Sequence, residues 1–201
     1  LSGGALPIYG RVVLSTEKLN KGLSIDENNY QAVIENGVIN EVFSNAVEDK
    51  GLFYTPDLAR KGSCFMGGNL AENSGGPKAV KYGTTKDYVL NLEVVLANGD
   101  VIWTGANVLK NSTGYNLTQI VTGSEGTLGI ITKIVVRLLS KPKENLLLLA
   151  SFNDITSPCV AVSKILNAGI TPSALEFMER NAVEWSMKHA EIPLTIEDEM
   201  Q

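Results

Sequence analysis

The sequence predicts an α+β fold, and three observations lead to this prediction. Residues 88–96 and 101–104 have strand composition and flank Ala97-Asn-Gly-Asp, a strong β-hairpin signal. The β-branched run over residues 130–139 predicts another strand, which ends at Lys141-Pro142. Helical patterns are interspersed without strict βαβ alternation, which favours α+β over a doubly wound sheet. We therefore expect one mixed or antiparallel sheet that holds residues 88–104 and 130–139, with helices packed against it.

The other elements follow from hydrophobic periodicity. Residues 11–15 and 30–35 are predicted strands, and residues 38–49 have the one-sided apolar spacing of an amphipathic helix. Residues 146–152 predict a strand, residues 155–167 a helix that closes at Gly169, and residues 174–190 a further helical segment. Because residues 140–145 resemble a seam, we expect two domains, residues 1–140 and 146–201.

Composition and charge exclude several classes of protein. The chain has 201 residues, of which 44% are hydrophobic and 19% charged, so it can build a core and is not a disordered chain. Its net charge of −5 argues against a nucleic-acid partner. No apolar run reaches the roughly 18 residues of a membrane span.

Cysteine and histidine usage argues against a disulfide scaffold and a zinc site. Cys64 and Cys159 are the only cysteines, which suits a reducing compartment, and no signal peptide is recognisable. We therefore expect a cytoplasmic protein. Together with the single His189, these cysteines show no metal-ligand spacing, so no metal site is predicted.

Glycine is concentrated in the middle of the chain. Twelve of the 19 glycines lie between Gly62 and Gly129, in two clusters at residues 61–77 and 122–131. Glycine permits positive φ and close approach to the backbone, and free N–H groups in such loops can form an anion site. A dinucleotide pyrophosphate is a natural occupant, and ordinary tight turns between strands are the alternative.

The standard nucleotide and hydrolase motifs are absent. No G-x-x-x-x-G-K-[ST] or G-x-G-x-x-G occurs, since Gly123, Gly126 and Gly129 are spaced by three. A P-loop and a Rossmann site are therefore disfavoured. The lack of G-x-S-x-G and the single histidine also disfavour a Ser-His-Asp triad.

Six ordered blocks within residues 53–139 carry a family resemblance. They are Tyr54-Thr-Pro-Asp, residues 61–76 (ending Gly67-Gly-Asn-Leu-Ala-Glu-Asn-Ser-Gly-Gly), Lys81-Tyr-Gly-Thr-Thr-Lys-Asp-Tyr-Val, Leu92-Glu-Val-Val-Leu-Ala-Asn-Gly, Thr113-Gly-Tyr-Asn-Leu-Thr-Gln and Gly123-Ser-Glu-Gly-Thr-Leu-Gly-Ile-Ile-Thr. Together they resemble the flavin-binding domain of FAD-linked oxidases of the vanillyl-alcohol-oxidase superfamily, within the group that holds D-lactate dehydrogenase and the flavin-binding chain of glycolate oxidase. Residues 1–7 resemble the end of the family's first pyrophosphate loop. Residues 146–201 resemble the beginning of its substrate, or cap, domain.

The resemblance implies noncovalently bound FAD and oxidation of a D-2-hydroxy acid to the 2-oxo acid. In such enzymes a base removes the hydroxyl proton and the C2 hydride passes to flavin N5. The resemblance leaves open the electron acceptor (a quinone, a cytochrome, another flavoprotein or dioxygen) and whether the protein forms a homo-oligomer or joins a partner subunit.

The resemblance also predicts that the chain is a fragment of its family's length. The first half of the pyrophosphate loop would precede Leu1, and most of the cap, with the family's metal-binding histidines and likely base, would be missing. Catalytic residues therefore cannot be assigned, and the chain alone is expected to be inactive. A FAD-binding subunit or remnant without catalysis is the main alternative. A cell-wall precursor reductase of the same fold is a weaker one, because it shares the fold and not these blocks.

The resemblance assigns cofactor-binding roles within the glycine clusters. Asn69, Asn73 and Ser74 would lie along the flavin, with bonding inside the loop as the alternative. Asp57 would flank the flavin or cap a short helix, and Glu125 would hold the loop shape by accepting hydrogen bonds from backbone N–H groups or by capping a turn. The full expected set is Pro56, Asp57, Ser63, Gly67, Gly68, Asn69, Asn73, Ser74, Gly75, Gly76, Glu125, Gly126, Gly129, Ile130 and Ile131.

Overall fold

The fold is built on a five-stranded antiparallel sheet of order β1-β2-β6-β4-β5. The structure, a computed structural model, describes residues 6–7, 9–10, 12–56 and 62–190. The strands are β1 (Leu23–Asp26), β2 (Gln31–Glu35), β6 (Ile130–Arg137), β4 (Val89–Val95) and β5 (Val101–Trp103), and β3 (Leu52–Phe53) pairs with β7 (Leu139–Ser140) beside them. The predicted α+β class and the antiparallel sheet of residues 88–104 and 130–139 are confirmed.

The hairpin between β4 and β5 closes where the sequence signal predicts it. Gly99 adopts φ 89°, which its missing Cβ permits, and the N–H of Leu96 donates to the carbonyl of Asp100 over 2.9 Å. β6 lies between β2 and β4, so both of its edges are paired, and its residues Ile134, Val135 and Val136 are 0% exposed.

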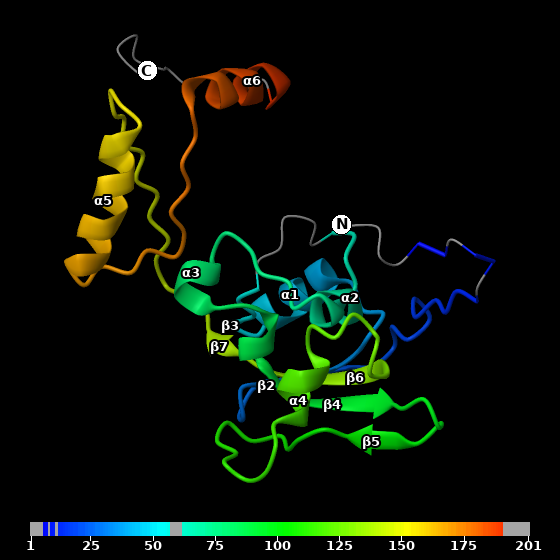
Figure 1. The fold of residues 1–201 in the computed structure, drawn as a ribbon. Helices are drawn as coiled ribbons and strands as arrows, with labels where there is room; N and C mark the ends of the chain where they lie inside the picture. Colours follow the sequence, from blue (N-terminus) through cyan, green and yellow to red (C-terminus); the bar gives the residue numbers. More distant parts are fainter. Residues whose placement is uncertain (1–5, 8, 11, 57–61, 191–201) are drawn as a thin grey trace.

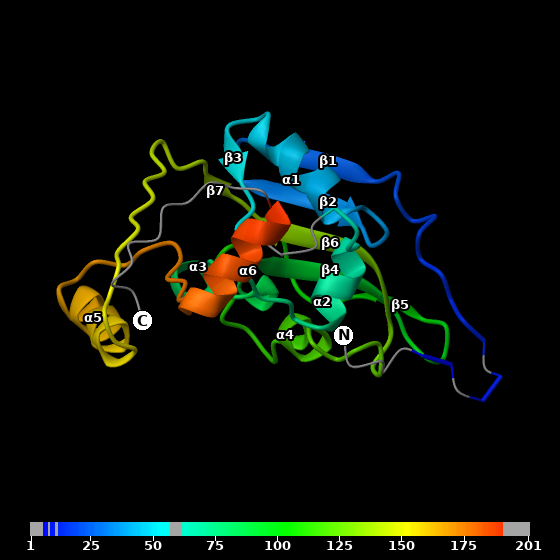
Figure 2. The same cartoon turned by 90° about the horizontal axis from the view of Figure 1, so that it is seen from above.

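Short helices cover one face of this sheet (Figures 1 and 2). These are α1 (Asn40–Glu48), α2 (Met66–Ala71), α3 (Ala79–Tyr82) and the 3-10 turn η1 (Thr85–Asp87). Phe43 of α1 and Met66 and Leu70 of α2 are fully buried and belong to the same core cluster as the apolar strand residues. Each such burial stabilises the fold by roughly 1.5–3 kcal/mol. α4 (Leu117–Val121) lies between the β5 strand and the second glycine cluster in the chain.

Two predicted strands are not formed. Val12, Val13 and Leu14 are 96%, 69% and 63% exposed without pairing, and Arg11 lies outside the described residues. Residues 146–152 are likewise unpaired, and Leu147 is 98% exposed. A strand needs a neighbour that accepts its hydrogen bonds, and no strand of the described chain runs beside either segment. Hydrophobic pattern alone therefore gave the wrong prediction at both places.

The last part of the described chain carries two helices and no core. α5 (Thr156–Asn167) ends as predicted before Gly169, whose φ is 78°. α6 (Arg180–Ala190) begins later than the predicted residue 174. None of the residues 141–190 is buried, and both helices lie away from the sheet in Figure 1.

Candidate functional site

The two glycine clusters meet in space, as predicted from their shared resemblance to one site. The N–H of Gly123 donates to the carbonyl of Leu70 over 2.8 Å, and the N–H of Glu125 donates to that of Ala71 over 2.9 Å. A Cβ on Gly123 would lie 3.3 Å from the Cβ of Asn73. Segments about 50 residues apart in the sequence therefore form one continuous wall.

The first cluster contains a helix where the sequence suggested a loop. The N–H groups of Met66 and Gly67 at the start of α2 donate to the carbonyls of Val38 and Asn36, at 2.9 and 2.8 Å. Gly67 is buried, and a Cβ there would collide with the Asn36 amide, so its role is close packing and not the open backbone access that we expected.

Gly68 and Asn69 are different, because their donors are unused. A Cβ on Gly68 would meet nothing within 4 Å, and its N–H makes no hydrogen bond among the described residues. Asn69 is only 3% exposed, and its Nδ2 finds no hydrogen-bond partner in the described ranges. Leaving a buried donor unpaired costs about 1–3 kcal/mol, so this amide lowers the free energy of unfolding. Two adjacent free donors fit the oxygens and ring heteroatoms of a nucleotide cofactor such as FAD.

The end of the first cluster is held by the segment that follows α3. The Oδ1 of Asn73 accepts from the Oγ1 of Thr84 at 3.1 Å and from the N–H of Lys86 at 2.9 Å. The carbonyl of Ser74 accepts from the N–H and the Oγ1 of Thr85 at 3.1 and 2.7 Å. The side-chain oxygen of Asn73 is therefore engaged by residues outside its own cluster. We call Asn73, Ser74 and residues 84–86 the loop clamp.

The other predicted residues of this cluster lie around the clamp. A Cβ on Gly75 would be 3.6 Å from the Cγ2 of Thr84, and the carbonyl of Gly76 accepts from the N–H of Ala79. Ser63 is exposed and Pro56 is buried, while Asp57 lies outside the described residues. Thr84 and Thr85 also belong to the clamp, but the sequence analysis did not predict them as site residues. Their place in the block 81–89, which carries part of the family resemblance, could have indicated them.

The second cluster is a tight turn made by its backbone. Gly123, Glu125 and Gly126 have φ of 84°, 51° and 77°. The carboxylate of Glu125 is exposed and accepts no hydrogen bond from the described residues, so the expectation that it holds the loop is wrong there. The loop is held by main-chain bonds to α2 instead.

The start of β6 is occupied by its neighbours. A Cβ on Gly129 would lie 2.6 Å from the Cγ1 of Val94 and 2.8 Å from the carbonyl of Val95. Ile130 and Ile131 pair with β4, and the carbonyl of Ile131 also accepts from the Nδ2 of Asn36. Gly129 is therefore needed for close strand contact, while the side chain of Ile130 stays 40% exposed, and the cofactor-binding role of these residues stays a prediction.

Two buried polar residues beside this region were not predicted. Tyr54 and Thr55 are 3% and 1% exposed, and their hydroxyl oxygens have no hydrogen-bond partner. Burial raises the pKa of Tyr54 far above its ordinary value, because the phenolate would lose its water; nearby Thr85 opposes the shift without being aligned for a hydrogen bond. Tyr54 also packs edge-on against Phe43, with ring centroids 5.0 Å apart. Tyr54 therefore stays protonated and serves packing, and it does not act as a base.

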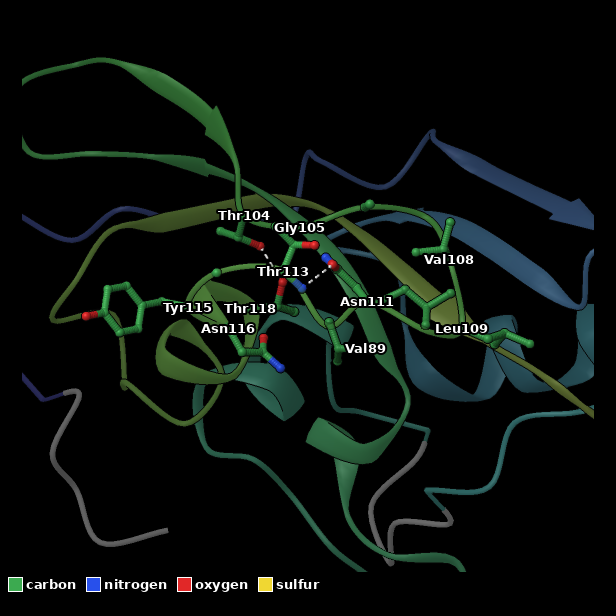
Figure 3. A pocket seen from close by; sticks show the side chains of 13 residues that line it. Val89, Thr104, Gly105, Val108, Leu109, Asn111, Thr113, Tyr115, Asn116 and Thr118 are labelled. Carbon is green, nitrogen blue, oxygen red and sulfur yellow. Dashed lines mark hydrogen bonds between the residues drawn. The ribbon is translucent and has the colours of Figure 1, made fainter.

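A pocket of about 160 Å³ lies elsewhere, between β4, α4 and the segment 104–116 (Figure 3). None of the predicted site residues lines it. Some of its polar groups are paired: the hydroxyls of Thr104 and Thr118 are 2.8 Å apart, and the N–H of Gly105 donates to the Oδ1 of Asn91 over 2.8 Å. This pocket lies outside the two glycine clusters and is therefore a weaker candidate than the Gly68 and Asn69 region.

The described residues contain no group of three or more His, Cys, Asp or Glu side chains arranged to hold a metal ion. Within the same ranges, no helix is both long and apolar enough to cross a membrane.

Comparisons with known proteins identify two family matches. Residues 1–105 match the family described as FAD binding domain, and residues 141–201 match FAD linked oxidases, C-terminal domain. A solved structure of alkyldihydroxyacetonephosphate synthase superposes with a TM-score of 0.65 at 26% identity, over 79% of this chain and 28% of that one.

Curated relatives are similar along nearly the whole chain. Glycolate oxidase subunit GlcD of Bacillus subtilis is 47% identical, and D-lactate dehydrogenase of Anaerostipes hadrus is 40% identical, over 90% and 91% of this chain. A probable mitochondrial D-2-hydroxyglutarate dehydrogenase of Oryza sativa is 38% identical over 95% of it. The chain covers 38%, 38% and 34% of these relatives' lengths, so it spans under two fifths of each.

Proposed function

Because this chain belongs to the FAD-binding domain family of the FAD-linked oxidases, we propose that the protein, at the length of its relatives, oxidises a D-2-hydroxy acid to the 2-oxo acid. The observation that supports this most strongly is the joining of the two glycine clusters beside the unused donors of Gly68 and Asn69. The named substrates of the relatives, glycolate, lactate and 2-hydroxyglutarate, share a hydroxyl next to a carboxylate.

The chain's own contribution in this proposal is to hold and shape the cofactor site. Bound FAD would supply the acceptor for the hydride that leaves C2 of the hydroxy acid. Gly68 and Asn69 donate to it, and Ser63, Ser74, Gly75, Gly76 and Gly126 line it. Gly67, Asn73 and Gly129 set its walls through packing and the loop clamp. Noncovalent binding of FAD is part of this proposal, and Cys64 is a free, half-buried thiol.

The catalytic base and any metal ligands lie outside this chain in our proposal. His189 on exposed α6 has no titratable cluster around it among the described residues. The protein acts in the cytoplasm and passes its electrons to an acceptor, which reoxidation of the reduced flavin by dyes, quinones or dioxygen would identify.

The test uses the full-length protein loaded with FAD. Anaerobic mixing with D-lactate, glycolate or D-2-hydroxyglutarate should bleach the oxidised-flavin absorbance, and L-lactate serves as the matched control. Bleaching by the L acid alone, or by none of these acids, would contradict the proposal.

A non-catalytic FAD-binding subunit is the second candidate, and the naming of a 47% identical relative as a subunit favours it. It predicts stoichiometric FAD with no bleaching by any hydroxy acid, so the same experiment separates the two.

A further inference from the structure

Of the described residues that line a second hollow, only Arg137 is charged, and none of them belongs to the glycine clusters. Arg137 ends β6, and its guanidinium lies 4.7 Å from the centroid of the Tyr88 ring. The hydroxyl of Tyr88 donates to the carbonyl of Tyr82 over 2.8 Å, which fixes the ring. The Nε of Arg137 is buried without a hydrogen-bond partner, and the described residues supply no carboxylate to it. Within the part of the chain that the structure describes, this positioned cation therefore has no carboxylate partner.

The hollow beside Arg137 has a volume of about 480 Å³, within the range of small-molecule sites. Its walls are mainly apolar, formed by Leu109, Leu138, Leu139 and the ring of Tyr30, with Asn28, Asn29 and Ser140 at the rim. The carboxylate of Asp26 does not line the hollow and accepts hydrogen bonds from the N–H groups of Asn28 and Asn29. Arg137 is therefore the charged group that a ligand in the hollow would meet, although the anionic Asp26 lies behind the rim.

The walls are held in place by main-chain and side-chain bonds. The carbonyl of Tyr30 accepts from the N–H of Leu138 over 2.7 Å, and Tyr30 adopts φ 53°. The Nε2 of Gln31 donates to the carbonyl of Asn107 over 3.1 Å, which ties down the loop that carries Leu109. A non-glycine residue at positive φ is a costly conformation that persists where the surroundings fix it, often at binding sites.

We propose that this hollow binds a monocarboxylate with an apolar body of several carbons. The guanidinium pairs with a carboxylate through parallel N–H···O bonds, and it is pre-oriented by the Tyr88 ring. The leucines and Tyr30 cover the apolar body, whose burial adds to the affinity. An inorganic anion would leave those apolar walls unused, and an uncharged molecule would leave Arg137 unpaired.

The test titrates the 201-residue chain with sodium octanoate and measures binding by calorimetry. Two control ligands separate the contributions: 1-octanol has the apolar chain without the carboxylate, and inorganic phosphate has negative charge without the apolar chain. Octanoate should bind at least about tenfold more tightly than either, and more weakly as salt rises. Arg137→Met keeps a stem over the Tyr88 ring and should lose at least about tenfold in octanoate affinity. The proposal would be overturned if octanoate did not bind, or if phosphate or 1-octanol bound as tightly as octanoate.

A second pair of variants avoids any folding defect at Arg137. Leu109 is 69% exposed on its loop, so neither Leu109→Asp nor the matched neutral Leu109→Asn should disturb the core. The new carboxylate of Leu109→Asp should compete for Arg137 and weaken octanoate binding well beyond the effect of Leu109→Asn. Equal affinity in the two variants would overturn a charge-based site. FAD binding should be unchanged in both, since Leu109 lies in neither glycine cluster.

Discussion

In the proposed site, the unpaired amide of Asn69 lowers the stability of the apo chain and contributes to FAD affinity. Asn69→Leu removes a buried amide whose Nδ2 is unpaired, so the apo chain should be as stable as the parent or more so. FAD affinity of the full-length protein should fall about 2- to 10-fold, the value of one hydrogen bond. Thermal unfolding and flavin titration measure the two effects. Thr85→Val is the control: its Oγ1 is bonded to Ser74, so this change should cost about 1 kcal/mol. A clear loss of apo stability in Asn69→Leu would contradict the assignment.

Gly68 and Gly67 are neighbours that should respond in opposite ways to an added methyl group. Gly68→Ala meets open space inside α2, so it should stabilise the apo chain by about 0.5–1 kcal/mol. The same methyl group should weaken FAD binding in the full-length protein if the cofactor approaches there. Gly67→Ala collides with the Asn36 amide and should destabilise by about 1–3 kcal/mol. Urea unfolding and flavin titration test both, and unchanged FAD affinity in Gly68→Ala would place the cofactor elsewhere.

At the scale of elements, the loop clamp determines the end of the first glycine cluster. Asn73→Gly keeps the backbone at φ 49° but removes the acceptor for Thr84 and Lys86, so it should cost about 1–3 kcal/mol. Asn73→Ala should cost about 1 kcal/mol more, because alanine is strained at positive φ. Hydrogen exchange should accelerate at the Lys86 amide in both variants. If Asn73→Gly were as stable as the parent with Lys86 still protected, the clamp would have no energetic role.

At the scale of the whole molecule, the proposed cofactor site receives few donors from this chain. Gly68 and Asn69 carry the unused donors beside the glycine clusters, and none of the described residues 141–190 is buried. Each charge-assisted bond that is not made removes roughly 1.5–3 kcal/mol from the affinity. The purified 201-residue chain should therefore be colourless and bind FAD weakly or not at all, whereas the full-length protein should hold it. A yellow preparation of this chain with stoichiometric flavin absorbance would show that these residues suffice.

Local signals predicted the elements whose structure is decided locally. The Asn98-Gly99 turn needs only its own φ and flanking strands, the helix at residues 155–167 ends at Gly169, and the run 130–139 is apolar enough to be central in any sheet. The α+β class and the meeting of the two glycine clusters followed from these signals and from the six blocks. Which family the chain belongs to was also readable from the blocks alone.

Only the tertiary structure decided what each residue does within that frame. The glycine-rich start of α2 is helical because Val38 and Asn36, distant in sequence, accept its first N–H groups. Gly67 and Gly129 serve packing, while Gly68, identical in type, is open. The β-like runs at 11–15 and 146–152 stay unpaired because no described strand runs beside them. Sequence patterns record local conformational preference, but hydrogen-bond partners, steric room and burial depend on groups brought together from elsewhere in the chain.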